Sequence, residues 1–63
     1  MEHGNLRDSQ GMYEKAMAAY DIALGIDPED ADALFDKGIT LKKMGNFAEG
    51  AKYIEQAVAL YMR

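Results

Sequence analysis

The chain has no cysteine and no tryptophan, and its 63 residues include one histidine, His3, and one proline, Pro28. Without cysteine, no disulfide can stabilise the fold. A single histidine near the start of the chain argues against a histidine-based metal site, so we expect neither a metal nor a cofactor. No apolar run approaches the roughly 18 residues that a membrane-spanning helix requires.

Basic residues are also scarce, with seven Lys and Arg against eleven Asp and Glu, a formal charge of -4. A chain of this sign gains nothing electrostatically from a phosphate backbone, so we expect no nucleic-acid and no membrane partner. The first five residues are polar and lack the apolar core of a signal peptide. Together with the absence of cysteine, this favours a cytoplasmic location.

The small size predicts that the chain needs support from another molecule. A domain of about 60 residues buries only about 60% of the surface that its unfolded chain exposes. Such domains are usually stabilised by disulfides, a metal or association. Because the first two are not expected here, we expect a protein or peptide partner, and in particular a homo-oligomer. The apolar content of 49% argues against disorder.

Three breaks divide the chain into four segments: Gly11, the string 27–30 around Pro28, and Gly45-Asn46. The three longer segments carry apolar residues at spacings of three and four, the period of an amphipathic helix. The segment 2–10 is short and only weakly amphipathic. An alternating strand pattern is absent, so the sequence predicts an all-α fold of about four helices. Asn46 and Glu49 have the spacing of a capping box.

No combination of residues predicts catalysis. Ser9 is the only serine, and His3 lies six residues away, which places the two on different faces of a helix. Pairs such as Asp30/Asp32 and Asp32/Asp36 could suggest a metal or acid–base chemistry. We favour their interpretation as N-terminal charges that complement a helix dipole. We therefore expect that the chain is not an enzyme.

The chain repeats itself without a gap when its second half is laid on its first. We call the displacement that carries Gly4 onto Gly38 the repeat shift, and it also carries Gly11 onto Gly45. Further matches join small or apolar positions of the two halves: Tyr13 with Phe47, Ala16 with Gly50, Ala23 with Ala57, Leu24 with Val58 and Ile26 with Leu60. These are the positions that packing constrains.

A helix-turn-helix period of about 34 residues with these small and aromatic positions resembles the tetratricopeptide repeat family. The resemblance covers essentially the whole chain. It implies a single domain of antiparallel helical hairpins, with a truncated first repeat over 1–30 and a second repeat over 31–63. It also implies which residues pack within and between the repeats: Gly4, Tyr13, Ala16, Tyr20, Ala23, Pro28, Leu34, Gly38, Leu41, Phe47 and Gly50.

Two close helix contacts follow from the small residues. Gly4 would lie against Ala16 in the first hairpin, and Gly38 against Gly50 in the second. A glycine inside a helix costs about 1 kcal/mol relative to alanine, so Gly38 and Gly50 need a packing benefit in return. Tyr13 and Phe47 would fill the bottom of each hairpin.

The resemblance also implies a concave face, built from the first helix of each repeat, on which peptide ligands lie. Carried over residue by residue, this face would comprise Asn5, Asp32, Phe35, Asp36, Ile39, Lys42 and Lys43. Phe35 and Ile39 would form an apolar anchor between an acidic and a basic end. The alternative is an ordinary solvated helix face with Phe35 packed partly into the core.

A second candidate surface lies at the end of the array. About three stacked repeats are needed for independent stability, and this chain has fewer than two. The last helix would then expose apolar residues that mark an interface. The residues expected in self-association are Ile22, Ile54, Ala57, Val58, Leu60 and Tyr61. The leading hypothesis is an interaction module or adaptor that self-associates through these ends. The alternative is a peptide-binding fragment of a longer array.

Overall fold

The computed structural model describes the backbone of residues 2–63 and the side chains of residues 11–63. It contains three helices: α1 (Glu2–Ile26), α2 (Ala31–Lys43) and α3 (Phe47–Tyr61). No strand occurs between residues 2 and 63, which confirms the all-α prediction. The prediction of about four helices is wrong, because the two segments on either side of Gly11 form one helix.

Helix α1 continues through Gly11 because nothing replaces the hydrogen bonds that a break would lose. A helix ends favourably when its last amides and carbonyls find other partners. The segment 2–10 offers only Leu6 as a large apolar residue to hold it in a hairpin. The predicted contact between Gly4 and Ala16 is therefore absent. Twelve residues separate them along one helix, a rise of about 18 Å.

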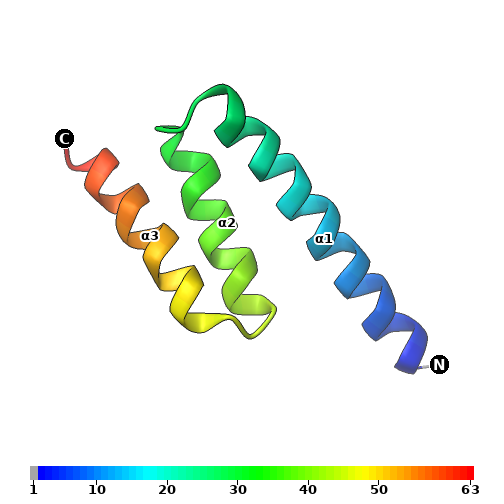
Figure 1. Cartoon of the computed structure of the whole chain (residues 1–63). Helices are drawn as coiled ribbons and strands as arrows, with labels where there is room; N and C mark the ends of the chain where they lie inside the picture. The colour runs from blue at the N-terminus through cyan, green and yellow to red at the C-terminus, as the bar shows by residue number, and fades with distance from the viewer. Residues whose placement is uncertain (1) are drawn as a thin grey trace.

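The link between α1 and α2 is made by its two aspartates. The Asp27 carboxylate accepts the backbone N–H of Glu29 at 3.0 Å and stabilises the turn. Asp30 is the N-cap of α2, and its carboxylate accepts the N–H of Ala33 at 3.1 Å. Pro28 lies in the turn that precedes the helix. This turn reverses the chain, so that α2 runs back along α1 (Figure 1).

The turn between α2 and α3 depends on Gly45, whose φ of +94° favours glycine. The Gly45 N–H donates to the Lys42 carbonyl at 3.0 Å, and the Asn46 N–H to the Leu41 carbonyl at 2.8 Å. This pair of bonds is a Schellman motif, which ends α2 sharply. Asn46 precedes α3 without a side-chain capping bond, so the predicted capping box is not formed.

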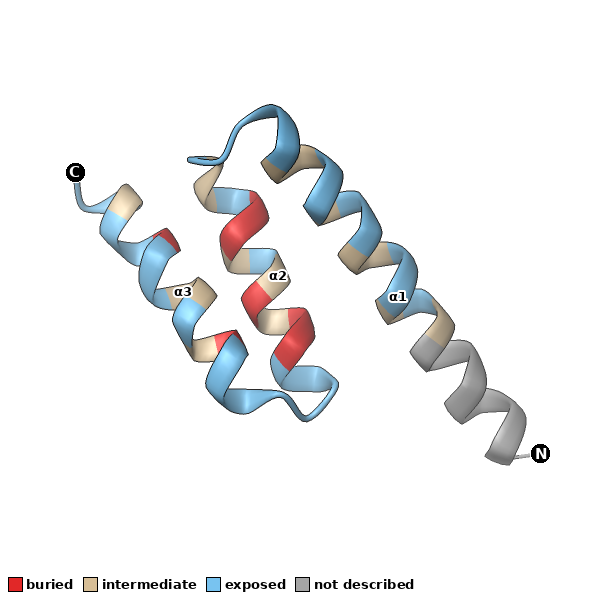
Figure 2. Ribbon diagram, in the orientation of Figure 1, coloured by how far each residue is buried: buried red, intermediate tan, exposed pale blue. Residues whose placement is uncertain are grey.

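Helix α2 lies between α1 and α3, and the three helices form a flat arrangement of 46 × 23 × 13 Å (Figure 1). The buried residues of the described side chains sit on α2 and on the facing side of α3 (Figure 2). Four hydrophobic residues form this core: Ala33, Leu34, Leu41 and Ala57. Among residues 11–63 no large side chain is fully buried. The two outer helices therefore keep open faces.

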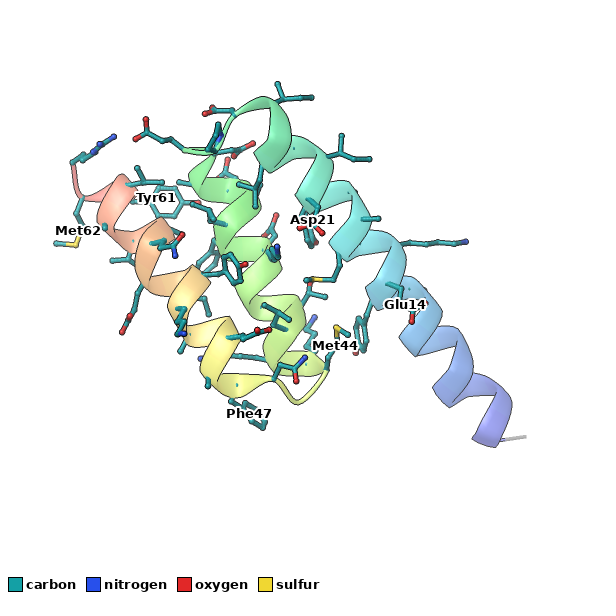
Figure 3. The ribbon with its side chains drawn as sticks, in the orientation of Figure 1. Glu14, Asp21, Met44, Phe47, Tyr61 and Met62 are labelled. Atoms are coloured by element: carbon teal, nitrogen blue, oxygen red, sulfur yellow. The ribbon has the colours of Figure 1, made fainter. Side chains whose placement is uncertain are left out.

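The expected packing residues differ in how far they are buried. Leu34, Gly38, Leu41 and Gly50 are buried in the α2–α3 contact. The α1 residues are half-buried, namely Tyr13, Ala16, Tyr20 and Ala23. Phe47 does not fill the bottom of its hairpin. It is 67% exposed and points away from the turn (Figure 3), because α3 begins at this residue and no helix among residues 2–63 covers it. Pro28 is exposed, and Gly4 lies outside the described side chains.

Candidate protein-interaction surfaces

Lys37 of α2 contacts both neighbouring helices and thereby fixes the rotation of α2 about its own axis. Its ammonium lies 2.6 Å from the Asp21 carboxylate of α1 and 4.5 Å from the centre of the Tyr53 ring of α3. The hydrogen bond to Asp21, opposed by desolvation, raises the pKa of Lys37 above its ordinary value. Asp21 lies on the side of α1 that faces α2 (Figure 3). Because Lys37 is held between α1 and α3, the opposite side of α2 faces solvent.

That solvent-facing side of α2 contains the residues of the expected concave face. Asp32, Asp36, Lys42 and Lys43 are exposed, and Phe35 and Ile39 are half-buried. Asp32 lies in the first turn of the helix and the two lysines in its last turn, as a helix dipole favours, and Asp36 lies one turn after Asp32. Asn5, the remaining member, lies outside the described side chains.

Tyr61 belongs to this α2 face, which the sequence analysis did not predict. Its ring meets that of Phe35 edge-on, with centroids 6.4 Å apart, and its hydroxyl donates a hydrogen bond to Asp32. This bond, with desolvation and the charges of Asp32, Asp36 and Asp30, raises the pKa of Tyr61 to about 12. The expected antiparallel hairpin could have predicted this contact. α2 and α3 form an antiparallel hairpin, which brings the end of α3 beside the start of α2.

A second surface runs along α3 at the edge of its contact with α2. Its apolar residues recur at spacings of four and three, and we call them the α3 end stripe: Phe47, Ala51, Ile54, Val58 and Met62. Phe47, Val58 and Met62 are exposed, whereas Ala51 and Ile54 are half-buried. The repeat shift relates the first four residues of this stripe to four residues of α1: Tyr13, Met17, Tyr20 and Leu24. These α1 residues are half-buried beside α2, so α3 presents the face with which α1 binds its neighbour.

The residues expected in self-association do not lie on one surface. Val58 lies on the α3 end stripe, and Ile22 is exposed on α1. Ala57 does not lie on a free face, because it is 0% exposed against α2. Ile54 also faces α2 in part, since a Cβ on Gly38 would lie 2.6 Å from its Cγ1. Leu60 is half-buried, and Tyr61 belongs to the α2 face.

An open hollow of about 340 Å³ lies where the α1–α2 link meets the end of α3. Arg63 and Glu29 form an exposed ion pair of 2.6 Å at its rim. The remaining lining residues are Pro28, Leu34, Gln56, Ala59 and Leu60. The lining offers no nucleophile beside a base. Among the described residues, no group of His, Cys, Asp or Glu could hold a metal ion.

Comparison with known families agrees with this arrangement of helical hairpins. A family model described as TPR repeat matches residues 4–45, which is about two thirds of the chain. The chain belongs to the tetratricopeptide repeat family. A second model, described as Tetratricopeptide repeat, matches residues 31–61 of this TPR chain, the range of α2 and α3. No curated protein and no solved structure gives a match.

Membership of the family defines the general role of the surfaces. TPR repeats generally mediate protein–protein interaction and are non-catalytic modules. In the part of the chain that the structure describes, no helix is long and apolar enough to cross a membrane.

Proposed function

We propose that this chain is a non-catalytic interaction module that self-associates through the open faces of its outer helices. The α3 end stripe carries this proposal. Tyr13 and Leu24 of α1 are half-buried beside a helix, whereas the equivalent Phe47 and Val58 of α3 are exposed, as is Met62. Burial of apolar surface contributes about 25 cal/mol per Å² to association, against the entropic cost of joining two chains. An uncovered apolar face on so small a domain is a favourable place for it.

Removal of two large side chains from the α3 end stripe tests the proposal. Phe47→Ser and Val58→Ser, combined, should lower the mass that light scattering reports at a fixed micromolar concentration. Met44→Ser is the matched control, since Met44 is 42% exposed and Val58 41%, but Met44 lies outside the stripe. Circular dichroism checks that helix content is retained. A mass unchanged by the double substitution would contradict a role of this stripe.

A second candidate is peptide binding on the α2 face. The aromatic pair of Phe35 and Tyr61 provides an apolar anchor, and Asp32 and Asp36 lie beside it. Such a site favours a ligand with an apolar residue close to a basic one. The charge pattern disfavours ligands that end in a carboxylate at this place, since Asp36 would repel them.

Fluorescence anisotropy with two labelled peptides tests this alternative. One peptide combines leucine with lysine, and the other replaces each lysine with glutamate. The chain should bind the basic peptide more tightly, and the substitutions Phe35→Ser and Ile39→Ser should abolish its binding while leaving helix content intact. Equal affinity for the two peptides would exclude the acidic end of the face as the determinant.

A further inference from the structure

Helix α1 carries an apolar face that its contact with α2 leaves uncovered. Its residues recur at spacings of four and three and form one line along the helix, which we call the α1 free stripe: Met12, Ala16, Ala19, Ala23 and Ile26. Met12 is 69% and Ile26 82% exposed, Ala19 is exposed, and the other two alanines are half-buried. None of the five residues of the stripe is polar.

The internal repeat shows what covers such a face. Moved forward by the repeat shift, the last four positions of the α1 free stripe lie on the side of α3 that packs on α2: Gly50, Tyr53, Ala57 and Leu60. There Gly50 is buried and Ala57 is fully buried, whereas the equivalent Ala16 and Ala23 remain half-exposed. The α1 free stripe is thus the repeat equivalent of a face that α2 covers in the second hairpin.

The chain contains the equivalent of residues 36–44, the second part of α2 and the residue after it, but this segment does not lie against its own stripe. It is the segment 2–10, in which Gly4 corresponds to Gly38. This segment continues α1 in a straight line beyond the end of α2 (Figure 1), so it cannot fold back on the same helix. We propose that residues 2–10 of a second copy pack on the α1 free stripe at Ala16 and Ala19 and that the exchange is reciprocal. This names the partner of the self-association proposed above and rests on it.

The α2–α3 contact predicts the register of the exchange. A Cβ on Gly38 would lie 3.1 Å from the Ile54 nitrogen, and one on Gly50 3.2 Å from the Lys42 nitrogen. Moved back by the repeat shift, these pairs become Gly4 with Tyr20 and Ala16 with Asp8. Residue 12 is the midpoint of Gly4 and Tyr20 and also of Asp8 and Ala16. Two antiparallel α1 helices in this register are therefore related by a two-fold axis at Met12.

Charge is complementary in this register. Asp8 of one copy lies opposite Ala16 of the other, beside Lys15. In the second hairpin the equivalent positions are Lys42 and Glu49, which also carry opposite charges, although they form no ion pair among the described side chains. The two-fold axis forms the Asp8–Lys15 contact twice. Ala16 carries the Cβ that Gly50 lacks, and the exchanged helices therefore pair at a slightly larger separation.

Single cysteines test the axis, and the absence of native cysteine removes any background. Met12→Cys should form a disulfide-linked dimer under mild oxidation, because the two copies of residue 12 meet on the axis. Ile22→Cys is the matched control, since Ile22 is 66% exposed but lies off the stripe. Linkage of Met12→Cys no greater than that of Ile22→Cys overturns the exchange.

A double substitution tests the register and the direction of exchange. Within one straight helix, residues 8 and 16 are separated by about 12 Å, too far for a disulfide. Asp8→Cys combined with Ala16→Cys should therefore link two chains, whereas Asp8→Cys with Ala18→Cys, on the exposed opposite face, should not. A bond within one chain would show that the hairpin closes on itself and would overturn the proposal.

Light scattering of the unmodified chain separates the two proposals, with circular dichroism as a check on each variant. A dimer that Met12→Cys and the Asp8→Cys/Ala16→Cys pair both link supports the exchange. A dimer that neither variant links overturns the exchange and leaves self-association through the α3 end stripe in place. A monomer at all micromolar concentrations overturns both.

Discussion

Gly38 and Gly50 meet backbone to backbone at the crossing of α2 and α3. A Cβ on Gly38 would lie 2.7 Å from the Gly50 carbonyl oxygen, and a Cβ on Gly50 2.6 Å from the Gly38 carbonyl oxygen. A backbone atom cannot move aside as a side-chain end can. The close approach of the two helices is therefore possible only with glycine at both positions.

The first prediction concerns the stability of this crossing. Gly38→Ala and Gly50→Ala should each lower the free energy of unfolding by about 1–3 kcal/mol, because overpacking outweighs the gain in helix propensity. Gly25→Ala is the control, since this helical glycine has nothing within 4 Å of a Cβ, and it should be neutral or stabilising. Urea unfolding at one fixed protein concentration measures all three. Equal effects at all three positions would contradict the packing at the crossing.

A second prediction separates a helix from a turn at two repeat-equivalent glycines. Gly11 is helical and open, so Gly11→Ala should raise helix content and add about 1 kcal/mol of stability. Gly45 has a φ of +94°, so Gly45→Ala should cost about 1 kcal/mol. Circular dichroism and urea unfolding report both changes. Destabilisation by Gly11→Ala would indicate a turn at that position and contradict the continuous α1.

The third prediction concerns the ionisation of Tyr61. The hydrogen bond to Asp32 and the nearby carboxylates raise the pKa of Tyr61 to about 12 from an ordinary 10.0. Ultraviolet difference titration of the unmodified chain against Tyr61→Phe isolates this group among the four tyrosines. Asp32→Asn should move the pKa back toward its ordinary value. Because the folded-state pKa is raised, this interaction stabilises the fold below pH 10 and is lost as the pH rises toward 12.

The fourth prediction concerns the link between α1 and α2. Asp21→Asn should reduce stability by about 0.5 kcal/mol at neutral pH, a modest value because Asp21 is largely exposed. The pKa of Lys37 is raised from 10.5, so the contribution is complete below that pH and disappears as Lys37 loses its proton above it. A double-mutant cycle with Lys37→Met, measured by urea unfolding across this range, tests the dependence. A coupling energy that is constant with pH would contradict it.

The sequence alone predicted the helical repeat and its register. Small residues that recur at the repeat shift report close helix contacts, and such contacts depend on residue size more than on distant surroundings. Gly38, Gly50, Leu34 and Leu41 accordingly lie in the α2–α3 contact. The solvent-facing side of α2 also follows from helical period, because Asp32 and Lys43 are exposed where the pattern predicts.

Only the tertiary structure decided which repeat positions are covered. Gly11 and Gly45 are the same residue at the same repeat position, yet one continues a helix and the other ends it. The difference lies in what packs nearby, since α2 has Leu34 and Leu41 to bind its neighbours and the segment 2–10 does not. Tyr61 likewise joined Phe35 and Asp32 because two distant helix ends meet. Local spacing determines a helix and its faces, but the energy of burying a face depends on a neighbour that local spacing does not specify.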